Sequence, residues 1–173
     1  QDYLAYISRI NKLGTAFDQA LDRARAAAGK GIRPPRFAWQ GVIDQSRKVI
    51  SGAPFDGGAD SALWADAQAK ADKLASDGKI TAERAAELKQ QARTALVEQF
   101  KPAYERVIAF GQEQLPLSLE NPAGIGSTQP NGAEYYTQLL RMHTSTDMDA
   151  EQIHQLGLSE VARLRGELEK VQE

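Results

Sequence analysis

The residues best suited to chemistry gather in the last third of the chain. His143, Thr144 and Asp147 lie close together and supply the histidine, hydroxyl and carboxylate types that a nucleophilic hydrolase uses. Catalytic triads normally assemble from distant segments, and the sequence has no Gly-x-Ser-x-Gly turn to present a nucleophile. Residues 144–147 also have the side chains that satisfy the backbone of tight turns. We therefore interpret this stretch as a turn between two helices.

A metal site is not expected within this chain. A zinc site needs three or four ligands that converge at about 2 Å, and the histidines are His143 and His154 alone. Even on one unbroken helix, a separation of eleven residues would place them about 16 Å apart along the axis. Asp149 is also a candidate helix start between them.

The glycine-rich stretches do not match nucleotide-binding patterns. Gly57-Gly58 and Gly124-Ile125-Gly126 do not follow a predicted strand, and no Gly-Lys-Ser/Thr combination occurs, so the phosphate-loop and dinucleotide fingerprints are absent. Gly132, directly before a helical pattern, is interpreted as permitting a close backbone approach or an N-terminal turn.

Two adjacent tyrosines begin the helix that follows. Tyr135 and Tyr136 point about 100° apart on a helix, so we do not expect both to be buried in one core. A phenol on a cleft wall can hydrogen-bond a peptide carbonyl or stabilise an oxyanion. Amphipathic packing with the hydroxyl in water is the alternative, and the sequence leaves both open.

Six helical patterns position these residues. The first runs from the start of the chain to Gly29-Lys30-Gly31, and the second follows Pro34-Pro35 and ends near Ser51. The third begins at Asp60 or Ser61, and the fourth is capped by Thr81 and runs past Pro102 as one kinked helix or two abutting ones. The expected inward residues of the first two are Leu4, Ile7, Ile10, Phe17, Leu21, Ala24, Ala28, Trp39, Val42, Ile43, Ser46, Val49 and Ile50.

The fifth and sixth helices follow a long loop. The helical pattern is lost over residues 115–131, which contain several Pro and Gly residues. The fifth helix holds Tyr135, Tyr136, Leu139 and Leu140. The sixth begins at Asp149, with Gln152 three residues on as a capping-box variant. Its apolar stripe is Ile153, Leu156, Val161, Leu164, Leu168 and Val171.

The predicted fold is therefore all-α, an irregular bundle of antiparallel hairpins with one long Pro-kinked helix and little or no sheet. We divide residues 1–173 into helical hairpins over 1–114, the loop over 115–131, and a helix-turn-helix over 132–173. The pattern is under way at Tyr3 and still running at Val171, as expected of a piece of a longer protein.

Composition excludes several classes of partner. In 173 residues, 21 basic and 23 acidic side chains nearly cancel and are interspersed, so the broad positive field that drives nucleic-acid binding is missing. No apolar run approaches the roughly 20 residues of a membrane-spanning helix, and the first residues lack the layout of a signal peptide. There is no cysteine, which excludes disulfides and thiolate ligands but leaves the compartment open.

The strongest family signal lies between Pro130 and Arg163. This stretch resembles the bacterial domain-of-unknown-function family 885 (DUF885), with its Pro-Asp-Gly-like turn, Tyr-Tyr helix, His-Thr-Thr-Thr-Asp-like turn and Ile-His-x-Leu-Gly-Leu-x-Glu-Val helix. Residues 31–35 add weaker support. Where the family commonly has Thr-Thr-Thr-Asp-Leu-Thr, this chain has Thr-Ser-Thr-Asp-Met-Asp at 144–149, and these changes keep the hydroxyl and capping chemistry.

The resemblance implies a function that the chain alone does not. Family members are mostly helical, much longer, and similar to zinc metallopeptidases in which two His and a Glu bind zinc and the Glu of H-E-x-x-H activates water. That motif is absent here, so the resemblance implies that this chain is a non-catalytic portion with no cofactor of its own. It also implies that the chain packs against the remainder of the parent protein and helps to form a peptide-binding cleft. The implied substrate-facing residues are Gly132, Tyr135, Tyr136, His143 and Thr144. Related proteins also look secreted or lipid-anchored.

A second class of function stays open. A stand-alone helical interaction or scaffold module would use the 115–131 loop and an exposed apolar stripe to hold a partner, with self-association through such faces.

Overall fold

The computed structural model describes residues 2–120 and 124–172, and it divides into two compact units, Gln1–Asn121 and Pro122–Glu173. The all-α prediction is confirmed, because the described residues contain helices and turns and, in place of a sheet, a single isolated bridge between Ala53 and Asp60. The six predicted helices are present, and the two units are described separately below.

One continuous helical rod organises the first unit. It consists of α4 (Ala82–Ala95), a π-helical turn (Leu96–Phe100) and α5 (Lys101–Gln114). Pro102 has no amide hydrogen, and its ring would clash with the carbonyl of Glu98 in a regular α-helix. The preceding turn is wider, with the Lys101 amide donating to the Leu96 carbonyl five residues back. The rod therefore passes Pro102 without a break.

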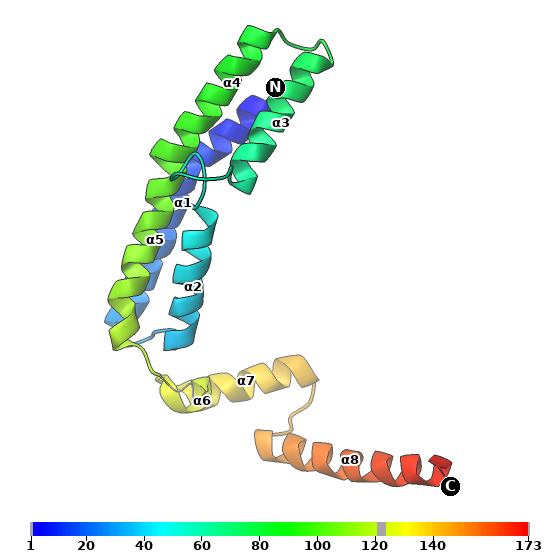
Figure 1. Ribbon diagram of the computed structural model, residues 1–173. Coiled ribbons are helices and arrows are strands. Elements are labelled where there is room, and N and C mark those ends of the chain that lie inside the picture. The colour runs from blue at the N-terminus through cyan, green and yellow to red at the C-terminus, as the bar shows by residue number, and fades with distance from the viewer. Residues whose placement is uncertain (1, 121–123, 173) are drawn as a thin grey trace. The chain divides into compact units, whose positions relative to one another are not determined.

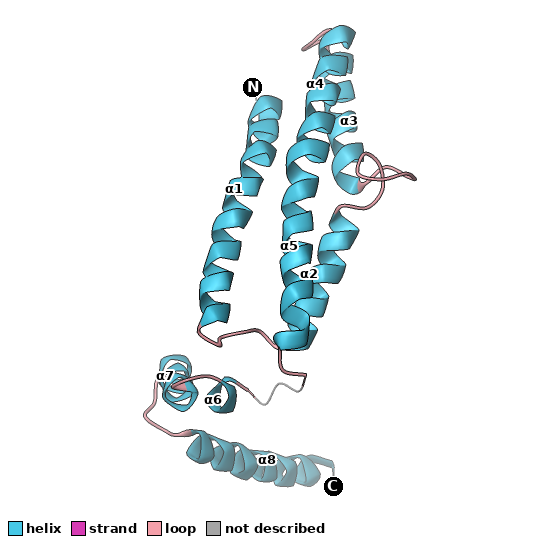
Figure 2. Cartoon of the chain, turned by 90° about the vertical axis from the view of Figure 1, so that its left-hand side faces the viewer, coloured by secondary structure: helices cyan, strands magenta, loops and turns pink. Residues whose placement is uncertain are grey.

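Three helices pack along this rod, as Figures 1 and 2 show. Helix α1 (Asp2–Gly29) contacts α4, the π-turn and α5. Helix α3 (Ala62–Ser76) pairs with α4, and α2 (Arg36–Val49) pairs with α5. Alanines let the backbones approach closely where these helices meet. The small side chains with at most 4% exposure are Ala67, Ala71, Ala85, Ala92, Ala95 and Ala103.

The register of α1 differs from the predicted one at its start. Leu4 was expected to face inward but is 45% exposed, whereas Tyr3 is buried. The Tyr3 hydroxyl donates a hydrogen bond to the Ala67 carbonyl at 3.0 Å, so one side chain fills the core and satisfies a backbone acceptor. Burial raises the pKa of the Tyr3 phenol above its ordinary value.

The inward face of α2 is narrower than predicted. Ile43 is 1% exposed, but Val42 and Val49 are 39% and 36% exposed. Helix α2 contacts α5 at Ile43, which lies directly over Gly111. A Cβ at Gly111 would stand 3.0 Å from the Ile43 Cγ1. That glycine centres the contact on Ile43.

The predicted helix caps are confirmed. The hydroxyls of Ser61 and Thr81 accept hydrogen bonds from the amides of Trp64 and Arg84. Asp149 and Gln152 form the reciprocal pair: the Gln152 amide donates to the Asp149 carboxylate at 2.8 Å, and the Asp149 amide donates to the Gln152 side chain at 2.9 Å.

The segment predicted as a loop over 115–131 is more structured than expected. It contains a 3-10 turn (Leu115–Leu117) and the one-turn helix α6 (Ile125–Thr128), and part of the predicted loop, residues 121–123, lies outside the described residues. Its start is held by α2, since the Arg36 amide donates to the Leu119 carbonyl at 2.9 Å. Buried Gln114 accepts from the Arg33 guanidinium at 3.1 Å. Sequence periodicity does not register such long-range bonds.

The second unit contains α6, α7 (Gly132–Thr144) and α8 (Ala150–Gln172). Helices α6 and α7 meet at Gly132, where a Cβ would lie 2.0 Å from the Ile125 carbonyl oxygen. The close backbone approach predicted for Gly132 is therefore confirmed, because no side chain fits between the two helices.

Replacing the rod's central side chain should destabilise the first unit. Leu96 is fully buried, so Leu96→Ala is expected to lower the free energy of unfolding by about 2–5 kcal/mol, measured by urea titration with circular dichroism. Val97, its neighbour in the same turn, is 37% exposed, and Val97→Ala should cost less than about 1 kcal/mol. Equal losses in the two variants would contradict this packing.

A methyl group at Gly132 should separate α6 from α7. We expect Gly132→Ala to speed amide hydrogen exchange in residues 125–136, since the Ile125 carbonyl must move. Gly157 in α8 has open space around its Cβ position, so Gly157→Ala is the matched control and should leave that exchange unchanged. Unchanged exchange in Gly132→Ala would show that the two helices do not pack as described.

Candidate functional site

All five predicted site residues lie on one helix, α7. Gly132, Tyr136 and His143 are separated by four and seven residues, which places them on one face of that helix. Tyr136 and His143 are two turns apart, or about 10 Å along the axis. Tyr135 points about 100° away from Tyr136 and lies outside this face.

Neither tyrosine is buried. Tyr135 is 52% exposed and Tyr136 is 43% exposed, while His143 and Thr144 are exposed at the far end of the helix. Tyr136 begins beside α6, since its Cβ is 3.8 Å from where a Cβ of Gly126 would stand. The phenol and the imidazole can each donate or accept a hydrogen bond. This face of α7 therefore presents two hydrogen-bonding groups, Tyr136 and His143, about 10 Å apart, a distance that an extended peptide can span.

The residues after His143 serve the turn, as their types predicted. The Thr144 hydroxyl donates to the Leu140 carbonyl at 2.8 Å and accepts from the Thr146 amide at 3.3 Å. Ser145 has a left-handed backbone (φ 55°) that ends α7. Asp147 lies 3.5 Å from the guanidinium of Arg141. Thr144 and Asp147 are thus engaged with the helix end, and among the described residues no hydrogen-bonded chain of nucleophile, base and carboxylate includes His143.

The side chains present do not fit a zinc ion. Within the described ranges, 2–120 and 124–172, no group of three or more His, Cys, Asp or Glu side chains is placed to hold a metal. His143 ends α7, whereas His154 lies in the first turns of α8.

Two features of the site were missed from the sequence. Met142 is 67% exposed and lies seven residues after Tyr135, so it extends that side of α7 with an apolar thioether; the spacing could have indicated this. The side-chain oxygen of Gln129 is buried and has no hydrogen-bond partner. No sequence signal marks it, because its burial depends on the close packing of α6 against α7.

Helix α8 carries the predicted apolar stripe, of which Ile153 is half-buried and the other five members are exposed. None of the α8 side chains that the structure describes is buried. The exposed fractions are 53% for Leu164, 59% for Leu168 and 83% for Val171. Large exposed apolar side chains in a row of this kind are typical of an interaction surface.

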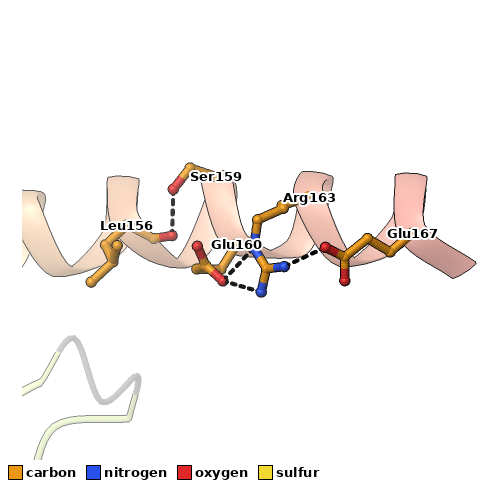
Figure 3. A network of polar contacts seen from close by, with 5 residues as sticks. All are labelled: Leu156, Ser159, Glu160, Arg163 and Glu167. Carbon is orange, nitrogen blue, oxygen red and sulfur yellow. Dashed lines mark hydrogen bonds and ion pairs between the residues drawn. The ribbon is translucent and has the colours of Figure 1, made fainter.

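The flank of this stripe is charged and internally paired (Figure 3). Arg163 contacts Glu160 at 2.8 Å and Glu167 at 2.7 Å, one turn away on either side. The hydrogen bonds that Arg163 donates to Glu160 and then to Glu167 raise the pKa of its guanidinium. Both carboxylates are thus paired within the helix itself, with one net negative charge left on the three side chains.

The first unit contains a groove of about 700 Å³. Phe100, Tyr104 and Leu63 form its apolar wall, and Lys48 and Asp60 bring charge to it. None of the five predicted site residues lines it. In the described part of the chain, no helix is both long enough and apolar enough to span a membrane.

Comparison with known proteins places these features in a family. The chain is similar to a solved structure described as "the putative lipoprotein from Colwellia psychrerythraea", with 26% sequence identity and a TM-score of 0.77. The match covers 95% of this chain and 26% of that protein, so the chain spans about a quarter of its length. No curated protein matches the sequence.

The family comparison covers the whole sequence. The family described as "Bacterial protein of unknown function (DUF885)" matches residues 1–173, including the α7–turn–α8 stretch that carries the resemblance in the sequence. This chain therefore belongs to the DUF885 family of bacterial proteins.

Proposed function

We propose that this chain is a non-catalytic helical portion of a peptidase-like DUF885 protein, in which α7 forms part of the wall of a peptide-binding cleft. The observation that carries the proposal is the exposed face of α7, where Tyr136 and His143 stand two turns apart. Nothing in the packing of α7 requires a phenol and an imidazole at these two positions. Both groups suit recognition of a peptide backbone, which offers carbonyl acceptors and amide donors in alternation.

In this proposal the chain binds the substrate, and the rest of the parent protein carries out the reaction. Because the described residues do not fit a metal, the reactive groups of the enzyme, including the zinc that the family resemblance implies, would come from the remainder of the parent protein. The chain's own contribution is to bind and orient. Tyr136 would hold one peptide group and His143 another farther along the substrate, which limits the orientations available for attack.

The supporting turn has a defined role in this scheme. Thr144, Ser145 and Thr146 fix the end of α7 through their own hydrogen bonds, so His143 projects from a well-defined last turn. Gly132 sets the other end of the helix by its contact with α6. We assign these residues to positioning, and Tyr136 and His143 to substrate contact.

A stand-alone interaction module is the second candidate. The observation in its favour is the exposed apolar stripe of α8, which a binding partner could cover. It predicts no dependence of peptide turnover on Tyr136 or His143, so the same variants discriminate the two functions.

The full-length protein carrying Tyr136→Phe or His143→Ala should turn over peptides more slowly. Loss of one hydrogen bond to the bound substrate should reduce kcat/KM by about 5- to 30-fold while thermal unfolding stays unchanged, because both side chains are exposed. Steady-state kinetics on a peptide library and a thermal melt measure both quantities.

His154→Ala is the control for the histidine. His154 is also exposed, but it lies on α8 and away from the proposed wall. We expect wild-type kinetics from this variant. Wild-type kinetics from Tyr136→Phe and His143→Ala as well would rule out α7 as a substrate-contacting wall.

We also propose that the full-length protein is exported and held by a lipid anchor. The support is the similarity to a solved structure that is described as a lipoprotein. Cell fractionation of the native host should find the protein in the membrane fraction and released by detergent. Recovery in the cytosol would contradict the proposal.

A further inference from the structure

The stripe of α8, defined here as Val161, Leu164, Leu168 and Val171, has the spacing of a helix-packing seam. Its members follow one another by three, four and three residues, the repeat with which one helix packs along another. Each member is more than half exposed, at 67%, 53%, 59% and 83%. The chemistry that fits this surface is the apolar face of another helix.

An exposed seam of this size is costly for a free helix. Most of the stability of a helix in a protein comes from packing its amphipathic face, and the described part of α8 buries no side chain. Fully covering each Leu or Val contributes roughly 1.5–3 kcal/mol. The seam is therefore suited to a permanent partner.

The similar solved structure indicates where such a partner comes from. This chain matches only 26% of that protein, so about three quarters of the related polypeptide has no counterpart in these residues. A partner on the same polypeptide is always present and pays no translational or rotational cost of association.

The features of α8 disfavour a second copy as the occupant. The seam runs from Val161 to Val171, about 15 Å of helix axis, so its four side chains supply much less surface than the about 800 Å² per partner that a stable complex buries. Paired helices from two chains also commonly exchange charges across their flanks. Arg163 pairs with both Glu160 and Glu167 on its own helix, which leaves this group one net negative charge, so the same group on a second copy would repel it (Figure 3).

We infer that the α8 stripe is an intramolecular docking face, covered in the full-length protein by the apolar side of a helix from outside residues 1–173. The inference rests on the proposed function only in treating this chain as part of a longer protein. It does not depend on peptide turnover or on α7.

Cysteine labelling of the full-length protein tests this directly. The 173 residues contain no cysteine, so Leu168→Cys places a single thiol in the stripe. Ser159→Cys, nine residues earlier, places one on the opposite, exposed face of α8 as the matched control. Mass spectrometry of the α8 peptide gives the rate at which a soluble maleimide modifies each thiol.

The expected result is that Leu168→Cys reacts at least about tenfold more slowly than Ser159→Cys, since a covered thiol reacts only through local opening. The ratio should not change over a roughly hundredfold dilution, because an intramolecular contact is independent of concentration. Equal rates would overturn the inference. A slow rate that becomes fast on dilution would also overturn it, because a second copy would then be the occupant.

Hydrogen exchange of the unmodified protein provides the same test without a substitution. In the full-length protein, amides of residues 161–171 should exchange at least about tenfold more slowly than in the 173-residue chain alone. Equally fast exchange in both would overturn the inference. Loss of activity in Tyr136→Phe, or its absence, has no bearing on either measurement.

Discussion

The first unit depends on one backbone constraint, the passage of a continuous helical rod across Pro102. All three other long helices of that unit pack on this rod: α3 on α4, α2 on α5, and α1 on both and on the turn between them. A sharp kink at Pro102 would change the direction of one half and separate α1 from it. The π-turn at Leu96–Phe100 absorbs the proline by widening one turn, and the same turn supplies Leu96 and Phe100 to the core. A local backbone adjustment thereby keeps the long-range packing intact.

The second unit differs from the first because the large side chains that the structure describes there do not form a buried core. Gly132 fixes α7 against α6 through a contact that admits no side chain. The reciprocal hydrogen bonds between Asp149 and Gln152 cap the N-terminus of α8. Beyond these fixed points, the unit presents a polar face on α7 and an apolar face on α8. Surfaces of this kind are typical of a segment whose contacts lie in the rest of a larger protein, which agrees with a match to about a quarter of the similar structure.

Much of the fold could be predicted from the sequence because local signals are strong here. Ser61, Thr81 and Asp149 are capping residues whose bonds span three positions, and they formed as expected. The errors involve contacts between distant segments. Tyr3 replaces Leu4 in the core because its hydroxyl finds the Ala67 carbonyl, and the 115–131 segment is partly ordered because α2 holds its start.

In the candidate site, too, local features could be predicted from the sequence and contacts between segments could not. Residue type was enough to interpret 144–147 as a turn. Tyr136 and His143 were selected by the family resemblance, and the structure adds that they share one face of α7. Spacing could not reveal the buried oxygen of Gln129, which depends on how closely two backbones approach.

The central claim, that α7 is a wall of the peptide-binding cleft, is tested most directly by a crystal structure of the full-length protein with a bound peptide analogue. The account predicts that the Tyr136 hydroxyl and the His143 ring each lie within about 3 Å of a polar atom of that peptide. A peptide bound on the order of 10 Å or more from both side chains, out of hydrogen-bonding reach, would contradict it.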